Sequence, residues 1–168
     1  MLVKKYLMIS FIFLTLTFSV IIKSNIRQHI LNSKFQSKAY TLEDFAKLKW
    51  LEGDWKGQME NKPLFFARYK FANDSVIISY SYRDSAMIDA ADSSTIFLHN
   101  GTIYDKGSSA IWVATKVDSA QIHFVPYRYA MNQFTWKLNP DGSWGIYVSL
   151  HNMSEASATE YVMRRINK

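Results

Sequence analysis

The sequence predicts an all-β protein, folded as an antiparallel up-and-down barrel of about 8–10 strands. A short N-terminal helix is predicted before the barrel, and an N-terminal transmembrane or signal helix before that. Three observations support this fold class. Beyond residue 53 apolar residues recur at every second position, turn signals interrupt them about every eight to twelve residues, and residues 39–168 contain nine Tyr, seven Phe and five Trp. Aromatic side chains are favoured on half-buried pleated sheets.

The first element of the predicted domain is a short helix. Thr41 can cap this helix, and Asp44, three residues later, completes a capping box. Leu42, Phe45 and Leu48 then fall on one face. We expect the helix to end at Gly53, where the period of the apolar residues changes from about 3.6 to about 2.

Alternating runs predict the strands that follow the start at Gly53, at residues 65–71, 77–83, 96–99, 102–104, 111–117, 122–124, 134–138, 144–150 and 159–166. The clearest turn between them is Asn100-Gly101, since both central positions of a type I′ turn need a positive φ. Asp105-Lys106-Gly107 is predicted as a further turn, and residues 126–129 as a loop.

Short hairpins joining about ten strands would leave two exposed sheet edges unless the sheet closes on itself. Closure into a barrel is therefore the fold that we predict. A sandwich of two sheets has the same periodicity and is the alternative.

The N-terminal region carries a targeting segment. Residues 6–22 contain no charged residue and follow two lysines, which is typical of a membrane anchor or an export signal. We therefore divide the chain into a signal anchor or signal peptide at 1–22, a basic polar linker at 23–40 and the barrel at 41–168. An uncleaved anchor is favoured because no good cleavage site follows. The barrel is then predicted on the exported side, periplasmic or at the cell surface, and a cytosol-facing anchored domain is the alternative.

The formal net charge of +6 comes from this N-terminal region. The first 38 residues contain six Lys and Arg and no acid, whereas the rest of the chain has fourteen basic and fourteen acidic residues. Nucleic-acid binding needs a concentrated basic face, so none is predicted for the barrel. The chain has no cysteine, which excludes disulfides, thiolate chemistry and a lipidated cysteine anchor.

The run from Trp50 to Trp55, with Gly53-Asp54-Trp55 at the mouth of the first strand, resembles the start of lipocalin-like barrels of the calycin superfamily. More narrowly, it resembles small uncharacterised exported bacterial domains. In such barrels the tryptophan plugs one end and an arginine from the last strand packs across its ring. The resemblance thus implies barrel closure by Gly53 and Trp55, with Arg164 and Arg165 as the two candidate arginines. It also implies that the barrel encloses a small hydrophobic or amphipathic ligand.

Aromatic and aliphatic side chains on the second and third predicted strands are the candidates for lining a ligand cavity. They are Phe65, Tyr69, Phe71, Ile78, Tyr80 and Tyr82. The alternative is that these side chains fill the interior, so that the domain is a structural or protein-interaction module. Barrels of this size can have either interior.

The sequence predicts no enzyme, since it has no nucleophile elbow, zinc-protease motif, phosphate loop or cysteine. No cofactor and no metal site are predicted. Some barrels similar to this one carry haem on a single histidine, and His151 is the weak candidate for that role. The expected partners are a small apolar ligand and, through the N-terminal segment, a membrane, and the sequence identifies no protein partner.

Overall fold

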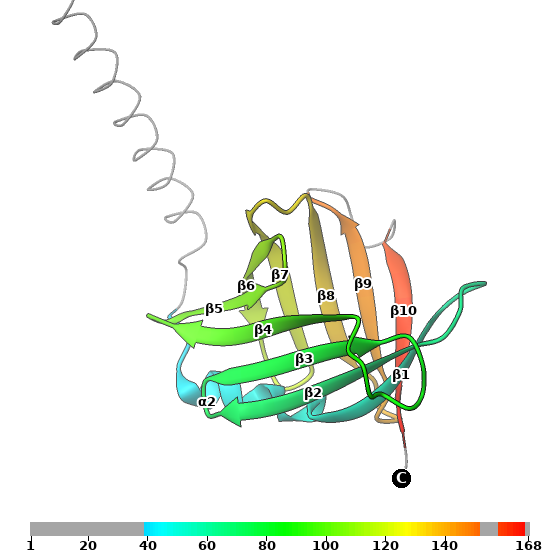
Figure 1. The fold of residues 1–168 in the computed structure, drawn as a ribbon. Coiled ribbons are helices and arrows are strands. Elements are labelled where there is room, and N and C mark those ends of the chain that lie inside the picture. The colour runs from blue at the N-terminus through cyan, green and yellow to red at the C-terminus, as the bar shows by residue number, and fades with distance from the viewer. Residues whose placement is uncertain (1–38, 152–157, 167–168) are drawn as a thin grey trace, which may run out of the picture. The chain divides into compact units, whose positions relative to one another are not determined.

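A computed structural model describes residues 39–151 and 158–166. Its ten strands form one closed barrel, in which the order of the strands is their order in the chain and β1 pairs with β10 (Figure 1). The elements are α2 (Leu42–Ala46), the 3-10 helix η1 (Lys47–Leu51), β1 (Gly53–Met59), β2 (Phe65–Asn73), β3 (Val76–Tyr82), β4 (Asp92–His99), β5 (Thr102–Lys106), β6 (Ile111–Val117), β7 (Gln121–Arg128), β8 (Asn132–Leu138), β9 (Trp144–Leu150) and β10 (Thr159–Arg165). The predicted all-β barrel is confirmed, and the sandwich is excluded because β1 pairs with strands on both sides.

The short helix forms as its capping residues predict. The Thr41 hydroxyl accepts a hydrogen bond from the Asp44 N–H at 3.2 Å, and the Asp44 carboxylate accepts one from the Thr41 N–H at 3.2 Å. Phe45 and Leu48 are fully buried, and the Phe45 ring meets Phe71 of β2 edge to face. Leu42 is exposed, so it does not share the buried face that the sequence predicts for it. Together, α2 with Phe45 and η1 with Leu48 and Leu51 cover one end of the barrel.

The topology gives the barrel two different ends. Because β1 begins directly after η1 and every neighbour is antiparallel, the β2–β3, β4–β5, β6–β7 and β8–β9 turns lie at the end next to the helix. The remaining connections, such as those after β1 and β7, lie at the opposite end. We call these the helix end and the open end. A hydrogen bond from the Tyr40 N–H to the Gly101 carbonyl, 2.8 Å long, ties the chain before the helix to the β4–β5 turn.

Aromatic rings fill the interior near the helix end. Trp144 is fully buried and lies edge to face against Trp55 and Tyr69, with ring centroids 5.8 and 5.6 Å apart. Trp136 and Phe124 extend this cluster across the barrel. Edge-to-face rings at these distances are in their favoured geometry. In this half of the barrel the interior is a packed core, as the filled-core alternative predicts.

Two local predictions are wrong and one is confirmed. Asn100 and Gly101 have φ of 48° and 74°, as the predicted turn requires. Residues 126–128, predicted as loop, belong to β7, where Pro126 pairs with Trp112 beside a register shift. A shift of this kind lets a strand accept a proline, which has no N–H to donate. Asp105 and Lys106, predicted in a turn, are the last residues of β5.

The predicted anchor at 6–22 and the linker up to residue 38 lie outside the described residues. Among the residues that are described, no helix has the length and apolar character needed to cross a membrane.

Candidate functional site

Arg165 ties the end of the last strand to the start of the first. Its guanidinium lies 4.4 Å from the centroid of the Trp55 ring, and its Nη1 donates to the Glu52 carbonyl at 2.9 Å. Gly53 has a φ of +127°, and a Cβ there would lie 2.5 Å from Arg165 Nη1. Of the two candidate arginines, Arg165 is the one over the ring. Arg164 lies on the outer face, opposite Lys56 in the register of β10 with β1. We call the contact of Arg165, Trp55 and Glu52 the clasp.

The clasp leads to a first prediction, with Arg164 as the matched control. Arg165→Ala is expected to lower the free energy of unfolding by about 1–2 kcal/mol, through loss of a cation–π contact and a charged hydrogen bond. Arg164→Ala removes the same charge without these contacts and is expected to change the free energy by less than about 0.5 kcal/mol. Urea denaturation followed by circular dichroism measures both values. Equal losses in the two variants would show that the clasp does not stabilise the barrel.

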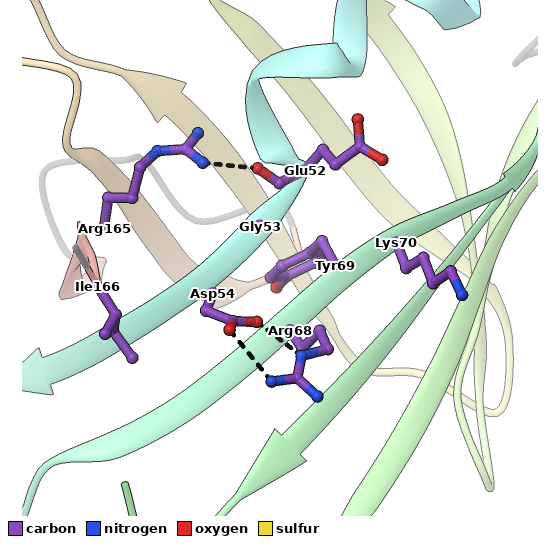
Figure 2. Close-up of a pocket in the computed structure, with 8 residues that line it drawn as sticks. All are labelled: Glu52, Gly53, Asp54, Arg68, Tyr69, Lys70, Arg165 and Ile166. Carbon is purple, nitrogen blue, oxygen red and sulfur yellow. Dashed lines mark hydrogen bonds and ion pairs between the residues drawn. The ribbon is translucent and has the colours of Figure 1, made fainter. Parts of the chain in front are cut away.

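A surface cleft of about 420 Å³ lies beside the clasp, lined by Glu52, Gly53, Asp54, Arg68, Tyr69, Lys70, Arg165 and Ile166 (Figure 2). Two of its charged groups, Asp54 and Arg68, form an ion pair. Arg68 holds Asp54 through two hydrogen bonds of 2.6 and 3.1 Å, and this carboxylate raises the pKa of Arg68. Figure 2 shows Lys70 pointing away from that ion pair. The cleft belongs to the barrel closure, where the Asp54–Arg68 ion pair joins β1 to β2 and Arg165 joins β10 to the residue before β1.

The inner face of β3 differs from the one that the sequence predicts. Tyr69 faces inward on β2 and pairs with Ser79, and Ala67 pairs with Ser81, so the serines of β3 face the interior. The side chains of Ile78, Tyr80 and Tyr82 alternate onto the outer face, so Ile78 and Tyr82 do not line the cavity as predicted, whereas Tyr80 is among the residues that line the pocket described below. On the outer face Tyr82 pairs with Phe66, and the Arg68 guanidinium lies 5.8 Å from its ring. Side chains alternate between the two faces of a strand, so an error of one residue in deciding which side chains point inward assigns every side chain to the wrong face.

The three candidates on β2 do face inward, but they lie at different depths. Phe71 is next to the helix, against Phe45 and beneath Lys49, whose ammonium is 4.1 Å from the ring centroid. Phe65 and Tyr69 lie further toward the open end and line a pocket.

The pocket at the open end has a volume of about 200 Å³. One wall comes from β2, through Phe65, Ala67 and Tyr69. The wall next to it in the same sheet comes from β3 and β4 and is polar, and its residues are Ser79, Tyr80, Ser81, Asp92, Ser93 and Ser94. The serines on this wall are the functional candidates that the sequence analysis missed. Their signal is the alternation of Ser79 and Ser81 with the tyrosines, which marks the opposite face of the same strand.

Asp105 on β5 faces the interior next to this polar wall. It pairs with the fully buried Ile96 on one side and with Trp112 on the other, and is itself 5% exposed. Burial raises the pKa of this carboxyl to about 6, against a smaller lowering by the Ser94 hydroxyl. Burial also raises the pKa of Tyr69, with a further contribution from Asp105. Asp105 thus lies beside two residues of the pocket wall.

Exposed apolar side chains surround the open end. The described residues include six large hydrophobic side chains that are exposed, and five of them lie here: Leu64, Ile88, Tyr129, Met131 and Leu150. We call these five residues the rim. Tyr129 has a φ of 58° and is 91% exposed. Such a φ is unusual for a bulky residue and indicates a backbone that its surroundings hold in place.

The predicted haem candidate lies away from the interior. His151 is exposed in the turn after β9, and its Nδ1 is 3.3 Å from the Gln133 Oε1. Within the described residues, no group of three His, Asp or Glu side chains is placed to hold a metal ion.

No known protein-family model matches the chain, and no curated protein matches it. Among solved structures the chain is similar to the T-type phycobiliprotein lyase CpeT from Prochlorococcus phage P-HM1. The TM-score is 0.47 and the sequence identity 10%, over 76% of this chain and 98% of the other. That structure is named a lyase, and the prediction that this barrel is not an enzyme is withdrawn.

Proposed function

We propose that the barrel binds a small amphipathic molecule in the pocket at its open end. The observation that carries this proposal is an apolar strip, formed by Phe65, Ala67 and Tyr69 of β2, beside a polar strip formed by the serines of β3 and β4. Ligand sites commonly combine an apolar lining with a few polar groups that fix the orientation of the ligand. The rim would give an apolar molecule its first contacts on the way in.

The pocket limits the size of the ligand. Its volume of about 200 Å³ is below the roughly 300–1,000 Å³ of sites for drug-sized molecules. It exceeds the roughly 150 Å³ of a cavity that holds benzene. We therefore expect a molecule of about one ring with a short polar substituent.

We also place the chain among exported lipocalin-like domains, as an anchored barrel on the periplasmic or cell-surface side. The clasp supports this assignment, since it has the arrangement that the resemblance implies, as do the apolar segment 6–22 and the basic linker at 23–40.

A protein-interaction role is the second candidate, and the rim favours it. Exposed apolar side chains gathered at one end of a domain, as these five are, are a feature of contact surfaces. In that case the packed aromatic core would serve only stability, and the pocket would remain without a ligand.

The variant Ser81→Phe tests ligand binding, because it places a ring in the pocket from its polar wall. Its control is Thr95→Phe, which adds a ring to β4 at a position paired with Ile78 on the outer face. The full chain, purified from its own cell, is expected to release a small molecule in native mass spectrometry. It should also bind 2-phenylethanol in calorimetry. Thr95→Phe should retain both properties and Ser81→Phe should lose them.

Two results would contradict the proposal. One is wild-type protein that carries no molecule and does not bind 2-phenylethanol at millimolar concentration. The other is Ser81→Phe protein that binds the probe as tightly as the wild type, which would place the site elsewhere. Co-isolation of one protein with the wild type, together with its loss in Leu150→Lys on the rim, would support the interaction role instead.

A further inference from the structure

Four polar side chains follow one another across the inner faces of β2, β3, β4 and β5. Tyr69 pairs with Ser79, and Ser79 pairs with Ser94 with their hydroxyl oxygens 2.9 Å apart. The Ser94 hydroxyl in turn lies near enough to the Asp105 carboxylate to lower its pKa. Tyr69 and Ser94 line the pocket, so Asp105 lies directly behind the pocket wall.

One carboxylate oxygen of Asp105 accepts no hydrogen bond from the described residues. This atom, Oδ1, is buried, and no donor among the described residues reaches it. The ion pairs of this part of the chain involve Asp44, Glu52, Asp54 and Asp118 instead. A buried carboxylate is unfavourable unless donors or a cation compensate it. A ligand in the adjoining pocket is placed to supply the hydrogen-bond donor or the positive charge that Asp105 lacks.

We propose that Asp105 selects the ligand by accepting a hydrogen bond from a protonated amine, so that the ligand is a small amphipathic cation. This inference rests on the proposed function, since the molecule must first occupy the pocket. Its apolar part would lie against Phe65 and Ala67, and its ammonium group would pass Tyr69 and Ser94 to reach Asp105.

The charges around the pocket favour a cation over other ligands of the same shape. Asp92, the only charged residue that lines the described pocket, carries the same sign as Asp105. A carboxylate ligand would meet two like charges, and an alcohol would leave the buried charge without a counter-ion. An amine stays protonated well above neutral pH, and thus compensates Asp105 over the physiological range.

The groups facing Asp105 from neighbouring elements allow a test by pH. Tyr69 on β2 and Asp92 on β4 are the titratable groups on these inner faces. Ser79 and Ser81 face inward from β3, and Trp112 and Ala114 from β6. Burial raises the pKa of Tyr69 above the range of the test. Protonation of Asp105 near pH 6 is then expected to weaken the binding of a cation.

Three probes that share one phenyl ring test the inference by calorimetry on the full chain. They are 2-phenylethylamine, 2-phenylethanol and 3-phenylpropanoate, which are cationic, neutral and anionic at pH 7.5. We expect the amine to bind about tenfold or more tightly than the alcohol, and the carboxylate to bind weakest. From pH 7.5 to pH 5 the amine should lose about tenfold in affinity and the alcohol should not change.

Three variants distinguish the effect of Asp105 on binding from the effect of other carboxylates. Asp105→Asn keeps the shape of the side chain and is expected to abolish both the preference for the amine and its pH dependence, while the alcohol still binds. Asp92→Asn tests the other carboxylate and should retain most of the preference. Asp89→Asn, which removes one negative charge from the exposed loop after β3, should behave as the wild type.

The outcomes distinguish the two proposals. If the wild type binds the alcohol as tightly as the amine, or if Asp105→Asn leaves the preference intact, Asp105 does not select the ligand and the binding function stands. A preference lost in Asp92→Asn alone would likewise overturn the role of Asp105. If no probe binds, the binding function fails, and the inference fails with it.

Discussion

Replacing Trp55 with alanine is expected to lower the free energy of unfolding by about 3–5 kcal/mol, the range for truncating a large buried aromatic residue. Trp55 is 1% exposed, and its indole N–H donates to the Leu51 carbonyl at 2.7 Å. The ring packs against Trp144 and carries the guanidinium of Arg165. One substitution thus removes core packing, the link from η1 to β1, and the clasp between the first and last strands.

Denaturation of the full chain in guanidinium chloride, followed by circular dichroism, measures this loss. Trp55→Phe keeps a ring and should lose less than Trp55→Ala. Tyr80→Ala removes an aromatic ring from the outer face and should cost about 1 kcal/mol, the centre of the range for point mutants. A loss below about 1 kcal/mol for Trp55→Ala would show that Trp55 is not the plug of the barrel.

Asp105→Asn is expected to stabilise the protein at pH 8, by about 1–3 kcal/mol. The folded carboxyl ionises near pH 6, whereas its ordinary pKa is 3.8. Between these values the folded state holds a proton that the unfolded state has lost. The free energy of unfolding of the wild type therefore falls as pH rises from about 4 to about 6, and the full penalty of about 3 kcal/mol applies above that range. Asparagine does not ionise, although its buried amide retains part of the cost.

Chemical denaturation at several pH values between 3.5 and 8, values chosen to bracket both ionisations, checks this prediction. The difference between Asp105→Asn and wild type should be small at the acidic limit and should grow up to pH 8. Asp89→Asn should follow the wild type throughout. A difference that is independent of pH, or a variant less stable than the wild type at pH 8, would show that Asp105 does not ionise in the folded barrel as its burial implies. If removing the charge of Asp105 stabilises the protein, this residue costs stability, as expected for a residue whose role is to bind a ligand.

Local patterns were sufficient for most of the fold. The alternation of apolar residues marks the strands, and the positive-φ turn at Asn100-Gly101 and the capping box at Thr41 are both present. These features depend on residues close together in the chain, and their geometry follows from backbone dihedrals and short-range hydrogen bonds. The β7 prediction failed at Pro126 because a proline is normally excluded from central strands, and only the neighbouring β6 provides the irregular pairing that accepts it.

The candidate site was harder to predict. Phe65 and Tyr69 were identified because apolar residues alternate along β2. On β3 the larger apolar side chains, among them Tyr80 and Tyr82, point outward, and small serines point inward. Hydrophobicity alone selects the wrong face there, because neighbours such as Phe66 and Arg68 cover the outer tyrosines, of which Tyr82 is buried and Tyr80 half buried. Asp105 was assigned to a turn. It follows the buried Ile103 by two residues, however, and this spacing places both side chains on the inner face of β5.

The sequence by itself determined the class of the fold, a range of about 8–10 strands that includes the ten observed, and the two residue types that close the barrel. It left Arg164 and Arg165 as equal candidates and placed Asp105 outside the interior. Only the tertiary structure decided both points. The inward side of a strand is set by its register with strands far away in the chain, and one residue of offset exchanges the two faces. The pairing of β10 with β1 puts Arg165 over Trp55, and the pairing of β5 with β4 puts Asp105 beside Ser94 within the barrel.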